Sequence, residues 1–155
     1  MILRVALAVV LTTALLAAVT PAVANAGAER ADGAVDRQLA ALAAELETMV
    51  ATDDPTADPG ARHVVELRLP GRSLTSAAVT RLRFTSRGGV ALATWRVGDG
   101  ATRSSTRLAG VPVHAAGGGA LTLRESGTHR LAFELRSQDG QRVLTVSRLG
   151  GEHGA

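Results

Sequence analysis

The longest uninterrupted hydrophobic pattern lies near the start of the chain. From Val5 to Ala24, twenty consecutive residues carry no charge, and Arg4 precedes them. At about 1.5 Å per residue, a helix of this length matches a hydrocarbon layer of about 30 Å. The pattern therefore predicts an apolar N-terminal helix.

The next stretch, residues 27–52, keeps a helical period but becomes amphipathic. Its apolar side chains recur at steps of three and four, which places them on one stripe of a helix. They are Val35, Leu39, Leu42, Leu46 and Met49. Two interpretations are open. The stripe packs on the protein's own sheet, which so short a stripe favours, or the helix is a stalk that packs against neighbouring subunits.

Beyond a linker at residues 53–62, which is rich in Asp, Pro and Gly, the period drops to two. Asp139-Gly140 is the strongest turn signal in this part of the chain. Gly117-Gly118-Gly119 is interpreted as a flexible connection, and residues 150–155 as a flexible tail. The segments expected to form strands are residues 63–69, 79–85, 90–97, 102–108, 120–124, 129–136 and 142–149.

These patterns predict an α+β fold. An apolar helix continues into an amphipathic helix, and a mostly antiparallel meander of six or seven strands follows. The expected organisation is a signal peptide or membrane anchor (1–26), an amphipathic helix (27–52), a linker (53–62), a β-rich domain (63–149) and the tail (150–155).

Two fates are open for residues 1–26. In the first, Pro21 ends the apolar run of a secretory signal, and Ala24-Asn25-Ala26 is its small-residue cleavage site, marked by Ala24 and Ala26. In the second, the segment from Val5 to Ala24 is an uncleaved transmembrane helix that holds the chain in the membrane, with Arg4 on the inner side of the membrane. Either fate predicts an exported protein, at the outer face of the cytoplasmic membrane or in the extracellular space.

Composition and charge narrow the possible chemistry. The chain has no Cys, Lys or Tyr, and only 2% of its residues are aromatic. Disulfides and thiolate metal sites are therefore excluded, and the core must consist mainly of Leu, Val and Ala. The net charge of +3 combines −6 over residues 27–58, +8 over residues 59–155 and the charge of Arg4.

Arginines on the polar side of the predicted strands are the one candidate binding surface. They are Arg68, Arg81, Arg83, Arg130 and Arg136. Such a face can bind a polyanion or a protein partner, and a plainly solvated face is the simpler interpretation. The near absence of stacking aromatic side chains argues against nucleic acid as the partner.

Motifs that carry catalysis are missing from the sequence. It contains no nucleophile elbow, phosphate-binding loop or metalloprotease helix. No two of its four histidines have the spacing of metal ligands; they are His63, His114, His129 and His153. We therefore expect no catalytic, cofactor-binding or metal-ligating residues, and no cofactor.

Several short segments stand out by their order along the chain. They are Ala28-Glu29-Arg30-Ala31-Asp32, Gly60-Ala61-Arg62-His63-Val64-Val65, Leu69-Pro70-Gly71-Arg72-Ser73, Thr94-Trp95-Arg96-Val97 and the close from Leu131 to Arg148. In this order they resemble small haloarchaeal proteins that are grouped only as a domain of unknown function. The resemblance covers most of the chain and implies a cell-surface or pilus-associated role. It brings no known catalytic or binding residues.

The sequence thus predicts a non-enzymatic exported or membrane-anchored protein, and a pilin-like accessory of a cell-surface filament is the specific expectation. Its partners would be the membrane, through an uncleaved N-terminal segment, and filament or pilus proteins. The alternative is a secreted binding module whose Arg-rich sheet face binds a polyanion.

Overall fold

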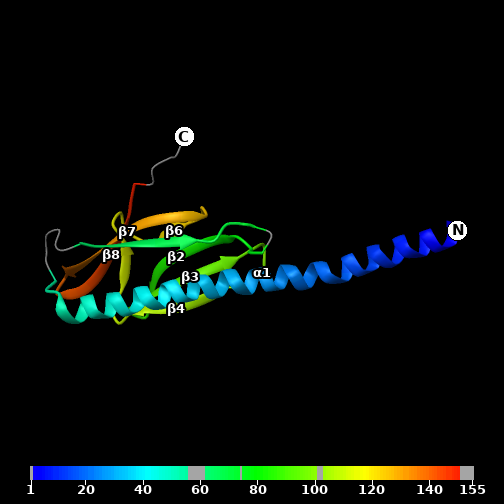
Figure 1. Ribbon diagram of the computed structural model, residues 1–155. Helices are drawn as coiled ribbons and strands as arrows, with labels where there is room; N and C mark the ends of the chain where they lie inside the picture. Colours follow the sequence, from blue (N-terminus) through cyan, green and yellow to red (C-terminus); the bar gives the residue numbers. More distant parts are fainter. Residues whose placement is uncertain (1, 56–61, 74, 101–102, 151–155) are drawn as a thin grey trace.

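The computed structural model describes residues 2–55, 62–73, 75–100 and 103–150. A single long helix, α1 (Ile2–Thr52), is followed by eight strands. The predicted α+β class and the continuation of the apolar helix into the amphipathic helix are confirmed. Half of α1 lies along the strands, and the other half projects away from them (Figure 1). Over the described residues, no helix is both long enough and apolar enough to cross a membrane.

The strands are close to those expected, with one addition. Seven of them overlap the segments that the alternating pattern predicts. The eighth, β5, is new, so the expected number of six or seven strands was too low. The strands are β1 (Arg62–Leu69), β2 (Val79–Arg87), β3 (Val90–Val97), β4 (Ser104–Ala109), β5 (Val113–Ala115), β6 (Leu121–Leu123), β7 (Gly127–Gln138) and β8 (Gln141–Leu149).

The strands form two sheets, and this arrangement corrects the expected meander. One sheet has the order β1-β7-β8-β5 and the other β4-β3-β2-β6. Only β2-β3, β3-β4 and β7-β8 are neighbours in both sequence and space. The strand β1 pairs with the distant β7, and β5 pairs in parallel with β8. Alternation along a strand cannot reveal such non-local partners, because it reports burial and not pairing.

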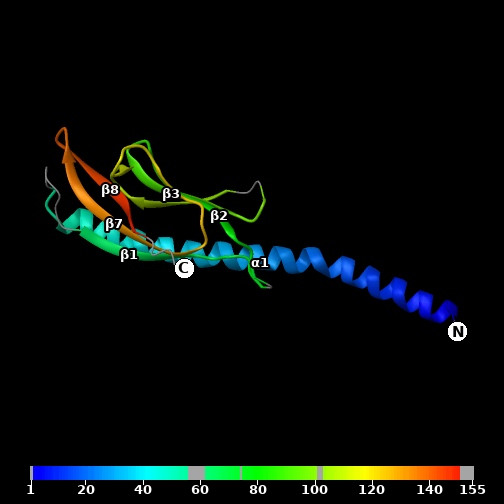
Figure 2. The same ribbon diagram turned by 90° about the horizontal axis from the view of Figure 1, so that it is seen from above.

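The core lies between α1 and the two sheets, which Figure 2 shows at an angle to one another. The stripe from Val35 to Met49 is buried against the inner faces of both sheets. Phe84 on β2 and Phe133 on β7 meet edge to face across this core, with ring centroids 5.9 Å apart. The interpretation in which the stripe packs on the protein's own sheet is therefore correct.

The predicted linker and tail fall largely outside the described residues. The helix α1 ends at Thr52 and β1 begins at Arg62, one residue inside the expected linker of residues 53–62. Residues 56–61 of that linker and residues 151–155 of the expected tail lie outside the description. The linker and the flexibility of the tail therefore stay predictions.

Candidate functional site

The N-terminal part of α1 carries the most unusual surface of the molecule. Eight of its large apolar side chains are 51–83% exposed, although apolar residues of this size are normally buried. They are Leu3, Val5, Leu7, Val9, Val10, Leu11, Leu15 and Val23. We call these eight side chains the apolar stalk surface. Figure 1 shows that this part of α1 extends beyond the sheets.

Contact between α1 and the sheets begins at the end of the apolar segment. Gly27 is buried, and its carbonyl accepts a hydrogen bond from the backbone N–H of Ala77 at 3.1 Å. One turn further, the carboxylate of Asp32 accepts hydrogen bonds from Trp95 Nε1 at 2.7 Å and Ser104 Oγ at 2.8 Å. These bonds fix the point at which the helix leaves the two sheets, which we call the head.

Polar contacts hold the rest of α1 on the head. The side-chain amide of Gln38 bonds both the N–H and the carbonyl of Arg68, at 2.9 and 3.0 Å, and so occupies part of the open edge of β1. Arg142 Nη1 donates to the carbonyl of Val50 at 2.8 Å, where the last helical carbonyls lack partners. The direction of the projecting part is thus set by a packed and hydrogen-bonded second half.

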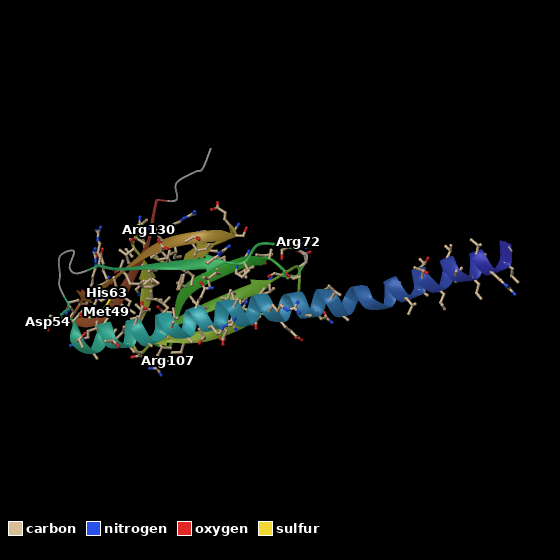
Figure 3. All side chains as sticks on the ribbon, in the orientation of Figure 1. Met49, Asp54, His63, Arg72, Arg107 and Arg130 are labelled. Carbon is tan, nitrogen blue, oxygen red and sulfur yellow. The ribbon has the colours of Figure 1, made fainter. Side chains whose placement is uncertain are left out.

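Two side-chain ion pairs connect the end of α1 and the residues that follow it to the strands. Figure 3 labels Asp54, His63 and Arg107 in this region. Arg107 of β4 lies 3.5 Å from Glu47, and His63 of β1 lies 3.0 Å from Asp53. Because all four side chains are substantially exposed, we expect each pair to contribute only about 0–1 kcal/mol.

The predicted cleavage site lies within α1. Ala24 is exposed in the projecting part, and Ala26 is half-buried where the helix meets the head. The boundary between projecting and packed helix therefore coincides with the predicted end of the signal. Cleavage there would remove the apolar stalk surface and leave the head, and it stays a prediction.

The five predicted arginines do not share one face. Arg68, Arg130 and Arg136 belong to the sheet with β1 and β7, and Arg81 and Arg83 belong to the other sheet. Arg130, which Figure 3 labels, lies 3.9 Å from Glu66 on the neighbouring strand.

Arg136 belongs to an ion cluster around the buried Glu134. Glu134 is only 4% exposed, and its carboxylate accepts hydrogen bonds from Arg62 Nε at 2.6 Å and from Arg136 Nη2 at 2.7 Å. The Arg136 hydrogen bond, joined by that of Arg62, lowers the pKa of Glu134 despite the opposing effect of burial. This cluster stabilises the fold and leaves Arg136 little freedom to bind another anion.

Two arginines that the sequence analysis did not single out lie beside Arg81 and Arg83. Arg96 is the cross-strand partner of Arg81, and Thr94 is that of Arg83. Arg103 precedes β4 and lines the same small hollow of about 40 Å³. We call Arg81, Arg83, Arg96 and Arg103 the arginine cluster.

Within the described ranges, no three His, Asp or Glu side chains are grouped closely enough to hold a metal ion. Of the histidines, His129 is buried and bonds the carbonyl of Glu125 through Nε2 at 2.8 Å, and His63 pairs with Asp53. His114 lies on β5, and His153 is outside the described residues.

The fold defines a small α+β protein in which a long N-terminal helix carries a two-sheet head. Residues 2–149 match the family described as Domain of unknown function (DUF7311), and the chain belongs to this family. No curated protein and no solved structure gives a significant match. The expected family of unknown function is thereby confirmed, and the haloarchaeal source and the pilus association stay predictions.

Proposed function

We propose that this protein is a non-enzymatic, exported cell-surface protein, a pilin-like accessory whose apolar stalk surface packs among the helices of a surface filament. The observation that carries the proposal is the exposure of eight large apolar side chains on one projecting helix. The outer face of the cytoplasmic membrane or the extracellular space is the location that fits this role.

Leaving the apolar stalk surface in water costs free energy, and this cost supports the proposal that a partner covers it. Burying one such side chain gains about 1.5–3 kcal/mol, and contiguous apolar patches of this kind mark interaction sites. From Val5 to Ala24 no charge interrupts the surface on any side of the helix. An apolar surface all round a helix requires apolar surroundings all round.

The shape of the molecule favours other helices as those surroundings. The projecting part runs from Ile2 to about Ala26, which is roughly 37 Å at 1.5 Å per residue. It continues the packed half of the same helix, so it extends from a head that is already complete. Alanines between the larger residues, such as Ala6, Ala8 and Ala14, allow neighbouring helices to approach closely.

The features that stand out in the head also suggest binding rather than catalysis. The carboxylate of the buried Glu134 is already paired with two arginines. The arginine cluster offers hydrogen-bond donors for an anion. The alternative role, a secreted module that binds a polyanion, loses the single five-arginine face on which it rested. It keeps Arg81 and Arg83, which lie on the same strand.

Single cysteines provide the test, because the natural chain has none and each introduced thiol is unique. We would place Leu11→Cys on the stalk surface and Ala44→Cys as a matched control, since both positions are exposed on α1. A maleimide–benzophenone reagent is attached to the thiol in intact cells of the native host and irradiated, so that the benzophenone inserts into a neighbouring C–H bond, and products are mapped by mass spectrometry. We expect Leu11→Cys to crosslink to the apolar helix of another copy or of a filament protein, and Ala44→Cys not to do so.

Three results would contradict the proposal. Equal reaction of both cysteines with a water-soluble maleimide would show that the stalk surface faces water. Protection of Leu11→Cys without any crosslink would place the surface in lipid instead of among helices. An intact mass of residues 27–155 alone would show that the stalk is removed as a signal peptide.

A further inference from the structure

We propose that the arginine cluster is a binding site for a phosphate or sulfate group. The site does not depend on the proposed filament role, so an experiment can disprove one of the two proposals and leave the other intact. It also differs from the five-arginine face expected from the sequence, because it excludes Arg68, Arg130 and Arg136 and includes Arg96 and Arg103.

The cluster gathers four positive charges at one end of the sheet β4-β3-β2-β6. Arg81 and Arg96 lie directly opposite each other on β2 and β3, and Arg83 is two residues from Arg81 on the same strand. Like charges placed directly opposite in a sheet destabilise it. A fold that keeps them together therefore gains most when an anion neutralises them.

Several arginines elsewhere in the described head have carboxylate partners, although Arg68, Arg87 and Arg124 form no ion pair among the described residues. Glu134 pairs with Arg62 and Arg136, and Glu125 pairs with Arg148 at 3.0 Å. Within the same described ranges, the guanidinium groups of the cluster form no ion pair and no hydrogen bond with a carboxylate. The cluster thus places four arginines around one hollow without a carboxylate partner among the described residues.

Arg96 supplies an independent sign of a missing partner. Its Nε is buried, and no hydrogen-bond acceptor lies within reach of it among the described residues. A buried donor without a partner costs roughly 1–3 kcal/mol, and an ion or a water commonly explains such a group. Arg96 lines the hollow together with Arg81, Arg83 and Arg103.

The size of the hollow and the donor type define the ligand. Guanidinium groups bind phosphate and sulfate oxygens with paired, charge-assisted hydrogen bonds, and the Thr94 hydroxyl adds a donor. The volume of about 40 Å³ is far below the roughly 300–1,000 Å³ of pockets that enclose a small molecule. The site therefore takes one tetrahedral oxyanion group, as a free ion or as a group on a larger polyanion.

The first experiment measures stabilisation of the full-length chain by the free ion, with a neutral detergent to keep the stalk soluble. Phosphate or sulfate at roughly ten times its Kd should raise the Tm by about 4 °C above chloride of equal ionic strength. The variant Arg81→Gln/Arg83→Gln should lose this shift. Arg68→Gln/Arg130→Gln, which removes the same charge from exposed positions on the other sheet, should keep it.

The second experiment identifies the source of the group by retention on immobilised heparin, a sulfated polyanion. If the natural ligand is a polymer, Arg81→Gln/Arg83→Gln should weaken binding by about tenfold or more, and the control variant should differ little from the natural chain. A Tm shift that depends on the cluster, without cluster-dependent retention, would assign the site to the free ion.

Equal losses in both double variants would show that only net charge matters and would overturn the site. The absence of any phosphate or sulfate effect in the natural chain would overturn it as well. Arg81 and Arg83 are exposed, so we expect their variants to keep the natural Trp95 fluorescence. If the double variant does not fold, Arg83→Gln alone replaces it against Arg68→Gln.

Discussion

At the residue scale, a few half-buried polar groups determine how the helix and the sheets fit together. Asp32 accepts hydrogen bonds from two strands, and Ser86 Oγ bonds both the N–H and the carbonyl of Val113, at 2.7 and 2.6 Å. Ser86 lies on β2 and Val113 on β5, so this hydroxyl joins the two sheets. Such bonds specify geometry because breaking one leaves a buried group unpaired.

Glu134 makes the stability of the protein depend on pH. Its lowered pKa means that, near its ordinary value of 4.5, the unfolded chain binds a proton that the folded chain does not. The contribution of Glu134 to the free energy of unfolding therefore rises with pH in this range, and it is lost as the pH falls through the folded-state pKa. We expect Glu134→Gln to lower the free energy of unfolding at pH 7 by about 1.5–3 kcal/mol, since charge-assisted bonds are lost.

Urea unfolding followed by Trp95 fluorescence at several pH values measures this effect. The difference between the natural chain and Glu134→Gln should shrink as the pH falls from about 4.5 through the lowered pKa of the folded state, because first the unfolded chain and then the folded chain binds a proton on Glu134. Glu66→Gln is the control: its carboxylate is 68% exposed and 3.9 Å from Arg130, so it should change stability by no more than about 1 kcal/mol. A difference for Glu134→Gln that is constant with pH would contradict the account.

At the element scale, α1 has two halves with opposite environments. Leu39 is fully buried, and Leu11 is 62% exposed on the same helix. We expect Leu39→Ala to lower the free energy of unfolding of the head by about 2–5 kcal/mol, because it leaves a cavity in the core. Leu11→Ala should change it by less than about 0.5 kcal/mol. Similar losses in both variants would show that the stalk surface is packed against the head.

The elements were predictable to the extent that their pattern is local. The turn at Asp139-Gly140 has positive φ at both residues, 52° and 75°, as a tight hairpin requires, and it joins β7 to β8 as expected. The strand β5 was missed because it has only three residues between Pro112 and the glycine run. The glycine run, expected to be a flexible connection, is a turn closed by hydrogen bonds between Ala115 and Gly119 and between Gly118 and Ala115.

The candidate site was predictable only in part. The turn at Gly88-Gly89 between β2 and β3 sets Arg83 opposite Thr94, so the register of this hairpin is a usable signal for a cluster on these two strands. The same register sets Arg96 opposite Arg81, and the bulge between Val79 and Arg81 lies beyond this pair. No sequence pattern indicates the approach of Arg103. The five-arginine face failed for a related reason, because alternation does not tell which sheet a strand joins.

At the scale of the whole molecule, the projecting part of α1 and the head have separate structural requirements. The head needs nothing from the stalk surface for its own core, and the stalk surface needs an apolar partner that the head does not supply. The proposed filament role requires export of the head with retention of the stalk, and the arginine cluster would then face the cell exterior.

The most direct measurement is the labelling of Thr128→Cys in intact cells of the native host with a membrane-impermeant maleimide. Thr128 is exposed on β7, and Ala93→Cys, at a fully buried position, is the control that should stay unlabelled. We predict that Thr128→Cys of the full-length chain is labelled as completely in intact cells as after lysis. Labelling only after lysis would place the head inside the cell and contradict the account.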